Sequence, residues 1–133
     1  MILIRDKEND SILFRVNAPT LEAADLCKRR LRYANLNGAV LRFSDMHRAD
    51  LWGTDLRGAD LRLANLTMAN LGNADFLGAN MDGVELDGAR YNERTRWPEG
   101  FRPELHNLIV EELPEAARAG KGPRLPAYAR EAA

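Results

Sequence analysis

The sequence has little of what catalytic, metal-binding or secreted proteins commonly use. It contains one cysteine, Cys27, which excludes an internal disulfide, and we expect that residue to be a reduced, half-buried thiol. The two histidines, His47 and His106, lie in segments of different character and show no metal-ligand spacing. Ser11 and Ser44 lie outside any nucleophile-elbow motif. The sequence therefore predicts no enzyme, no metal site and no cofactor.

A strong charge of either sign is also absent. The 19 basic and 20 acidic residues give a net charge of −1, which offers no electrostatic reason to expect nucleic acid or an anionic membrane as a partner. No apolar run approaches the length that spans a bilayer. The first six residues are too few and too soon charged for a signal peptide. We therefore expect a cytoplasmic protein with one modest domain.

An internal repeat of five residues dominates the middle of the chain. Every fifth residue from Leu26 onward is apolar, and at the 45% apolar content of the chain the whole series would arise by chance about once in 10⁵ frames. The series consists of Leu26, Leu31, Leu36, Leu41, Met46, Leu51, Leu56, Leu61, Leu66, Leu71, Phe76, Met81, Leu86 and Tyr91. Two residues before each of these stands a mostly small residue, and Asp or Asn commonly stands between the two, as in Ala59-Asp60-Leu61.

A period of five fits neither a helix nor an ordinary strand, so it indicates a repeated corner. The large residue and the small residue two positions before it point inward together, and the Asp or Asn between them points to water. The last two positions of each unit form a turn. The second turn position is glycine at Gly38, Gly53, Gly58, Gly78, Gly83 and Gly88. Glycine supplies the positive φ that the third residue of a type II turn requires.

The Ala-(Asp/Asn)-Leu-x-x units resemble those of the pentapeptide-repeat proteins, and twelve of them run without insertion from Ala34 to Glu93. This resemblance implies a right-handed, four-sided parallel β-helix with four units in each coil. The twelve units would then make about three coils, stacked to a height of roughly 15 Å. We place this β-helix at residues 34–93, between an N-terminal cap at 1–33 and a C-terminal region at 94–133.

The first 33 residues predict a cap made of a hairpin and a helix. Apolar residues at 2–4 and 12–16 flank a polar stretch, which is typical of a β-hairpin. Residues 20–31 have the features of a helix: Thr20 as its N-cap, and Ala24, Cys27 and Leu31 on one face. Arg29 supports this interpretation, because in a coil it would occupy a small inward position.

The C-terminal region predicts a plug, a helix and a tail. Trp97 and Phe101 have the size to plug the last coil, as in members of the family. Residues 103–113 predict an amphipathic helix that starts at Pro103. Its apolar stripe consists of Leu105, Leu108, Ile109 and Leu113. This helix either caps its own tower or mates with a second copy of the chain in a homodimer. We expect residues 120–133 to be extended or mobile.

An apolar strip is the candidate interaction surface. With twenty residues in each coil, Phe43 lies below Leu63 at outward turn positions, and Met68 lies at the next corner. Such a strip either binds a protein partner of unknown identity or is covered by the terminal segments. We also expect Trp52 to pack against the N-terminal cap, and to stack over Arg32 only if the coils extend that far.

The leading functional prediction is a non-enzymatic interaction or scaffold module that is able to self-associate. The alternative comes from the resemblance, because some pentapeptide-repeat proteins mimic DNA and protect a type II topoisomerase. That role needs acidic side chains stacked along one face. Here Asp45, Asp50, Asp55 and Asp60 form a ring around one coil instead. The sequence therefore favours the interaction module over the DNA mimic.

Overall fold

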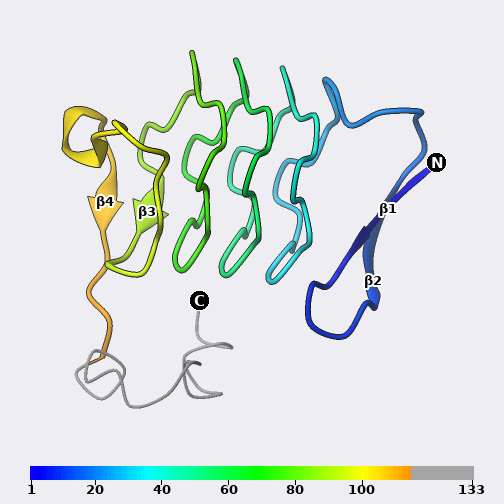
Figure 1. Ribbon diagram of the computed structural model, residues 1–133, viewed down its shortest axis with the longest axis horizontal. Coiled ribbons are helices and arrows are strands. Elements are labelled where there is room, and N and C mark those ends of the chain that lie inside the picture. Colours follow the sequence, from blue (N-terminus) through cyan, green and yellow to red (C-terminus); the bar gives the residue numbers. More distant parts are fainter. Residues whose placement is uncertain (115–133) are drawn as a thin grey trace.

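The computed structural model describes residues 1–114 and shows a tower of stacked coils with a hairpin at its N-terminal end (Figure 1). Its elements in chain order are β1 (Ile2–Arg5), β2 (Ile12–Val16), β3 (Arg90–Tyr91), the 3-10 helix η1 (Pro103–Leu105) and β4 (Ile109–Val110). β1 and β2 pair antiparallel, with Ile2 opposite Val16, so the predicted hairpin is confirmed. The predicted tail at 120–133 lies outside the described residues.

The coils stack through parallel bridges between residues that are 20 positions apart, such as Asp45 and Asn65. At each bridge the backbone bonds run in both directions along the tower: Leu41 N–H donates to Asp60 C=O at 2.8 Å, and Asp60 N–H donates to Ala39 C=O at 2.9 Å. Each side of a coil contributes only one bridged residue, so the stack is held mostly by isolated bridges. Only at its C-terminal end do two consecutive residues pair, as strands β3 and β4. The architecture is a β-helix type of solenoid with four five-residue units in each coil.

The interior is the ladder that the repeat predicts. The large residues from Leu26 to Phe76 are almost completely buried, and the alanines two positions before them line the same interior. Two polar residues at small positions are also accommodated there. Thr54 Oγ1 donates to Leu31 C=O at 2.7 Å, and Ser44 Oγ donates to Leu41 C=O at 2.7 Å. Both hydroxyls are satisfied by backbone carbonyls, so their burial leaves no unpaired donor.

Each corner from Ala23 to Gly88 is a tight turn with a left-handed third residue. In the unit from Leu36 to Ala39, Ala39 N–H donates to Leu36 C=O at 3.1 Å, and Gly38 has φ +68°. The Asp or Asn of the unit accepts the N–H two residues ahead, as Asn35 Oδ1 does from Asn37. This bond explains the preference for Asp and Asn, whose short side chains reach their own backbone in this way.

The helix predicted at 20–31 is wrong, because this segment forms the first coil of the tower. Its bridges Asp25–Asp45 and Arg30–Asp50 continue the pattern, and Leu26 and Leu31 are fully buried. The predicted start of the solenoid at residue 34 was therefore too late.

Arg29, which suggested the helix, is exposed at the open end of the first coil, and its guanidinium lies 4.4 Å from the centre of the Phe14 ring on β2. A coil with no other coil below it can accept a large residue at a position that is otherwise small. The hairpin covers this end and also joins the coil through an antiparallel bridge between Asp6 and Ala34.

The helix predicted at 103–113 is also wrong. Only Pro103–Leu105 is helical, as a single 3-10 turn, and the chain then runs extended over the last coil. Ile109 N–H donates to Ala89 C=O at 2.8 Å, and Glu111 N–H donates to Tyr91 C=O at 2.7 Å. The open edge of the last coil leaves backbone acceptors without a partner, and an extended segment satisfies them where a helix could not.

The tower also has more coils than the predicted three. Residues 21–40, 41–60 and 61–80 form three coils in register, and the bridges Asn65–Glu85 and Asn70–Arg90 begin a fourth. The next bridge joins Asp75 to Arg96, a step of 21 residues that places one extra residue in this coil. The repeat thus continues beyond Tyr91, and Trp97 follows in the fourth coil.

Candidate protein-interaction surface

The apolar strip, defined as Phe43, Leu63 and Met68, is exposed along one side of the tower. The three residues are 57%, 55% and 48% exposed, respectively. All three occupy the left-handed corner position, with φ between 58° and 60°. This conformation costs a residue with a Cβ about 1–2 kcal/mol, so the strip consists of large apolar side chains at a position where glycine fits best.

Two glycines of the next coil contact the strip from its C-terminal side. A Cβ on Gly83 would lie 2.7 Å from Leu63 Cδ2, and one on Gly88 would lie 3.3 Å from Met68 Cγ. The Leu63 and Met68 side chains therefore extend along the tower axis toward the C-terminal end and rest on bare backbone. The strip is continuous across coils because these corners of the next coil lack side chains.

Charged groups border the strip. Arg62, which precedes Leu63, forms an ion pair with Asp60 at 2.8 Å, and Arg42, which precedes Phe43, reaches Asp60 and Glu22 at 3.4 Å each. The hydrogen bond from Arg62 lowers the pKa of Asp60 from 3.8 to about 2. Asp60, which both arginines contact, therefore stays ionised to a lower pH than an ordinary aspartate.

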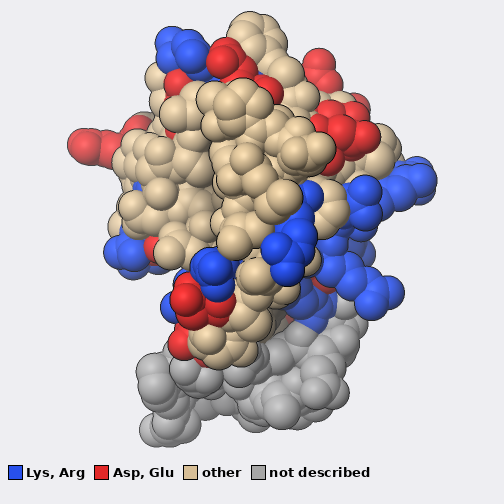
Figure 2. All heavy atoms as spheres, turned by 90° about the vertical axis from the view of Figure 1, so that its right-hand side faces the viewer, with Lys and Arg blue, Asp and Glu red and all other residues tan. Residues whose placement is uncertain are grey.

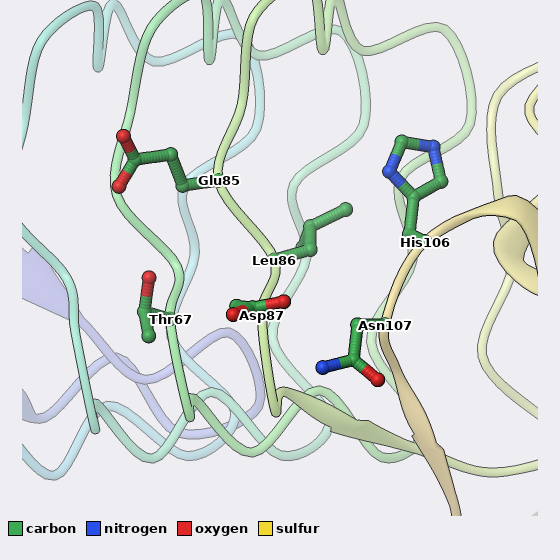
Figure 3. Close-up of a pocket in the computed structure, with 6 residues that line it drawn as sticks. All are labelled: Thr67, Glu85, Leu86, Asp87, His106 and Asn107. Atoms are coloured by element: carbon green, nitrogen blue, oxygen red, sulfur yellow. The ribbon is translucent and has the colours of Figure 1, made fainter.

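Two clefts lie at the C-terminal end of the tower and share His106. The first has a volume of about 370 Å³ and is shown in Figure 3. Its lining consists of Thr67, Glu85, Leu86, Asp87, His106 and Asn107. Leu86 points toward His106, which comes from the segment after η1 (Figure 3). The second cleft, of about 510 Å³, includes Gly83, Phe101 and His106. Because Gly83 lies beneath Leu63, the second cleft continues the line of the strip toward the end of the tower.

Trp97 and Phe101 form an aromatic stack on the last coil. The Trp97 ring lies parallel to that of Phe76, with 5.1 Å between centroids, and Phe101 stacks on Trp97 at 4.7 Å. The His106 ring follows on Phe101 at 4.7 Å. This column of four rings covers the apolar interior at the C-terminal end.

The apolar residues of the predicted helix are dispersed. Leu105 and Ile109 are 71% and 51% exposed, and Leu108 is half-buried against the core. Leu113 is buried in a separate cluster with Trp52 and Tyr33 on the side of the tower. The sequence carried no signal for this cluster, because Leu113 and Trp52 are far apart in the chain.

Trp52 belongs to this lateral cluster, and its partners Arg32 and Tyr33 fall within the residues predicted as the cap but belong to the first coil. Its ring meets Tyr33 edge-on at 5.6 Å, and the Arg32 guanidinium lies 6.0 Å from its centre. The stacking over Arg32 occurs because the coils extend below residue 34. A Cβ on Gly72 would approach Trp52 Cδ1 to 2.6 Å, so the indole also packs closely against the next coil.

Three of the four aspartates of the ring pair with arginines, and the fourth, Asp45, contacts His47 instead. Asp50 pairs with Arg32, Asp55 with Arg57, Asp60 with Arg62 and Asp75 with Arg96. Figure 2 shows the hairpin end, where uncharged residues cover the centre and charged residues of both signs surround it. The charges therefore give the DNA-mimic alternative no support.

Residues 1–114 contain neither a cluster of metal-ligating side chains nor a membrane-spanning helix. No group of three or more His, Cys, Asp or Glu side chains in this part of the chain is placed to hold a metal ion. Within the same residues, no helix has the length and apolar character needed to cross a bilayer.

These coils define a solenoid repeat protein, and the family model for pentapeptide repeats, in eight copies, matches residues 30–62 and 59–90. The chain belongs to the pentapeptide-repeat family, which is generally non-enzymatic and implies a right-handed β-helix type of fold. No curated protein matches the chain.

Several solved structures are similar to the chain, including three pentapeptide-repeat proteins. The pentapeptide-repeat protein alr5209 from Nostoc PCC 7120 is 29% identical with a TM-score of 0.40, over 68% of this chain and 83% of its own. Rfr23 from the cyanobacterium Cyanothece 51142 is 33% identical with a TM-score of 0.39, over 55% of this chain and 53% of its own. HetL from Nostoc sp. strain PCC 7120, which is involved in regulating heterocyst differentiation, is 26% identical with a TM-score of 0.31, over 69% and 54%. The chain thus spans about half the length of the last two.

Proposed function

We propose that the chain is a non-enzymatic module that binds a protein partner through the apolar strip. The observation that carries this proposal is the exposure of three large apolar side chains at neighbouring left-handed corners. Burying a fully exposed side chain of this kind yields about 1.5–3 kcal/mol, and because about half of each strip residue is already covered, a partner would gain roughly half of that per residue. Apolar residues on the partner, flanked by carboxylates that face Arg48 and Arg62, would complement this surface.

The test is a pull-down from the native cell with wild type and the variant Phe43→Glu/Leu63→Glu. A second variant, Phe43→Asn/Leu63→Asn, removes the apolar surface with a residue that tolerates the left-handed conformation. The matched control is Val40→Glu/Leu77→Glu, because these residues are also exposed, at 44% and 37%, on other parts of the tower. We expect a protein that wild type and control retain and both strip variants lose. Retention of the same proteins by the strip variants would exclude the strip as the binding surface.

We propose self-association through β4 as a second function of the same scaffold. The observation that favours it is the outer edge of β4, which pairs with no other strand among residues 1–114 and where Ile109 and Val110 are 51% and 60% exposed. Ile109 and Glu111 direct their N–H groups to the last coil. The backbone N–H and C=O groups of Val110, which lies between them, therefore face outward. A second copy could pair with this edge and cover its apolar side chains.

Light scattering after size-exclusion chromatography tests the homodimer. We expect a mass that rises to twice the monomer value with protein concentration, and a return to the monomer in Ile109→Lys/Val110→Lys. A monomer at every concentration would end the homodimer proposal and leave the strip proposal intact, because the two surfaces share no residue.

A further inference from the structure

Three chemically active side chains meet on the outer face of the first two coils. Cys27 Sγ lies 3.8 Å from His47 Nε2, and His47 Nδ1 lies 3.0 Å from Asp45 Oδ1. The order thiol, imidazole, carboxylate is that of a nucleophile, its general base and the group that orients the base. The apolar strip and the β4 edge use none of these residues, so the site is independent of both proposed functions.

The register of the coils sets this alignment. Cys27 and His47 occupy equivalent positions in successive coils, 20 residues apart, and the bond from Lys28 N–H to His47 C=O at 3.0 Å fixes their separation. Asp45 Oδ1 also accepts the backbone N–H of His47 at 3.1 Å. The carboxylate is therefore held by the turn itself, and it presents a fixed acceptor to the imidazole.

The carboxylate determines which nitrogen of His47 carries the proton. The side-chain and backbone hydrogen bonds from His47 lower the pKa of Asp45, so the group is an ionised, acceptor-only carboxylate at neutral pH. Its neighbour Nδ1 must then be the donor. In the neutral ring this leaves the lone pair on Nε2, the nitrogen that faces Sγ, free to accept the thiol proton.

The surroundings of the thiol allow a small reagent to approach. Cys27 is partly exposed, as are His47 and Asp45. Lys28 and Arg48, both exposed, follow Cys27 and His47 at the adjoining corner. Asp25 Oδ1 accepts the backbone N–H of Cys27, so the charged residues nearest to Cys27 and His47 along the two coils are Asp25, Asp45, Lys28 and Arg48.

We propose that Cys27, His47 and Asp45 form a modification site at which the Cys27 thiol exchanges with a low-molecular-weight disulfide. His47 Nε2 takes the thiol proton, and the thiolate attacks one sulfur of the reagent. A new S–S bond forms to Cys27 as the reagent S–S bond breaks, and the departing thiolate takes the proton from the imidazolium. The reagent disulfide is thus the oxidant, and the product is a mixed disulfide on the first coil.

Alkylation with iodoacetamide measures the nucleophile directly, because Cys27 is the only cysteine in the chain. An ordinary thiol is only about 3% ionised at pH 7, so assistance by a base leaves room for an acceleration of up to about 30-fold. We expect His47→Gln to slow alkylation at pH 7 by about fivefold or more. At pH 10, where an ordinary thiol is ionised without help, we expect the two rates to agree within about twofold.

Two further variants complete this experiment. Asp45→Asn keeps an oxygen for the backbone N–H but removes the negative charge, and we expect an intermediate rate at pH 7. His106→Gln changes the other histidine, which stacks on Phe101 at the far end of the tower, and we expect it to react like wild type. Equal rates for wild type and His47→Gln at pH 7 would overturn the proposal, and so would an equal loss of rate at both pH values.

Exchange itself is measured with oxidised glutathione and intact-mass spectrometry. We expect one glutathione adduct on the folded wild-type protein, removed by dithiothreitol, that forms several-fold faster than in His47→Gln. Circular dichroism checks that each variant is folded. An adduct that forms at the same rate in wild type and His47→Gln, or no adduct at all, would show that the three residues do not form an exchange site.

Discussion

Replacing Gly72 with alanine tests whether the Trp52 indole is fixed between coils. The new Cβ would lie 2.6 Å from Trp52 Cδ1, 2.7 Å from Nε1 and 3.0 Å from Asn92 Nδ2. Trp52 is only 6% exposed and is held by Tyr33 and Leu113, so it has little room to retreat. Overpacking of this kind costs about 1–3 kcal/mol. Since Gly72 is not among the residues with positive φ, alanine adds no strain of its own there.

A second term acts in the opposite direction. Alanine restricts the unfolded chain more than glycine does, which stabilises the folded state by about 0.4–1 kcal/mol. We therefore expect Gly72→Ala to destabilise the protein by up to about 2.5 kcal/mol in urea unfolding followed by circular dichroism. The control is Gly58→Ala, where φ is +67° and no atom lies within 4 Å of the new Cβ. In Gly58→Ala the loss of stability would come from the strained backbone conformation alone.

A double-mutant cycle separates the clash from the backbone. In a Trp52→Leu background, Gly72→Ala should be neutral or stabilising, whereas the effect of Gly58→Ala should be unchanged. The expected coupling energy between positions 52 and 72 is about 1 kcal/mol or more. A coupling below about 0.5 kcal/mol would refute the close packing of the indole against the third coil.

Three further changes test the core and the charge network. Thr54→Val should cost about 1–3 kcal/mol in urea unfolding, because it removes the buried bond to the Leu31 carbonyl; Thr54→Ser keeps the hydroxyl and should cost less. Phe76→Ala should cost about 3–5 kcal/mol in the same assay, because the ring is fully buried beneath Trp97; a loss below about 1 kcal/mol would contradict this packing. Because the pKa of Asp60 falls from 3.8 to about 2 on folding, its contribution is complete above about pH 4 and disappears as the pH falls toward 2. Asp60→Asn should therefore flatten the dependence of the urea midpoint on pH between pH 4 and 2, and an unchanged slope would show that the ion pair is not formed.

Much of the fold could be predicted because a repeat states the same rule many times. The inward positions, the glycine corners and the exposure of Phe43 and Leu63 all follow from one five-residue unit and a coil of twenty residues. The outward position of Asp and Asn was predicted, but the hydrogen bond that their side chains accept from the turn N–H was not. That bond depends on the turn geometry, which the residue type alone does not reveal.

The errors fall at the two ends, where the repeat has no neighbour on one side. Arg29 violates the rule for the inward small position, but the rule assumes a coil on both sides, and Phe14 of the hairpin takes that place instead. The spacing of Leu105, Leu108 and Ile109 fits a helix, but unpaired carbonyls on the last coil favour an extended chain. Neither the contact of Arg29 with Phe14 nor the unpaired carbonyls of the last coil can be recognised from the local sequence.

The site at Cys27 was missed because the predicted β-helix began at residue 34. Cys27 and His47 are 20 residues apart, and this spacing alone predicts their contact once the first coil is included. Assigning residues 20–31 to a helix removed Cys27 from the stack and hid the pair. The lateral cluster of Trp52 and Leu113 is different, because no spacing rule connects its members.

The 20-residue step of the bridges makes the tower extensible by whole coils. An in-frame duplication of residues 41–60 would give every backbone donor an equivalent acceptor one coil further along, and it would lengthen the tower by about 4.8 Å. The 21-residue step from Asp75 to Arg96 does the opposite, because it takes the following segment out of register and ends the series of identical coils. Height and termination are therefore specified separately: the first by the number of copies, the second by one inserted residue.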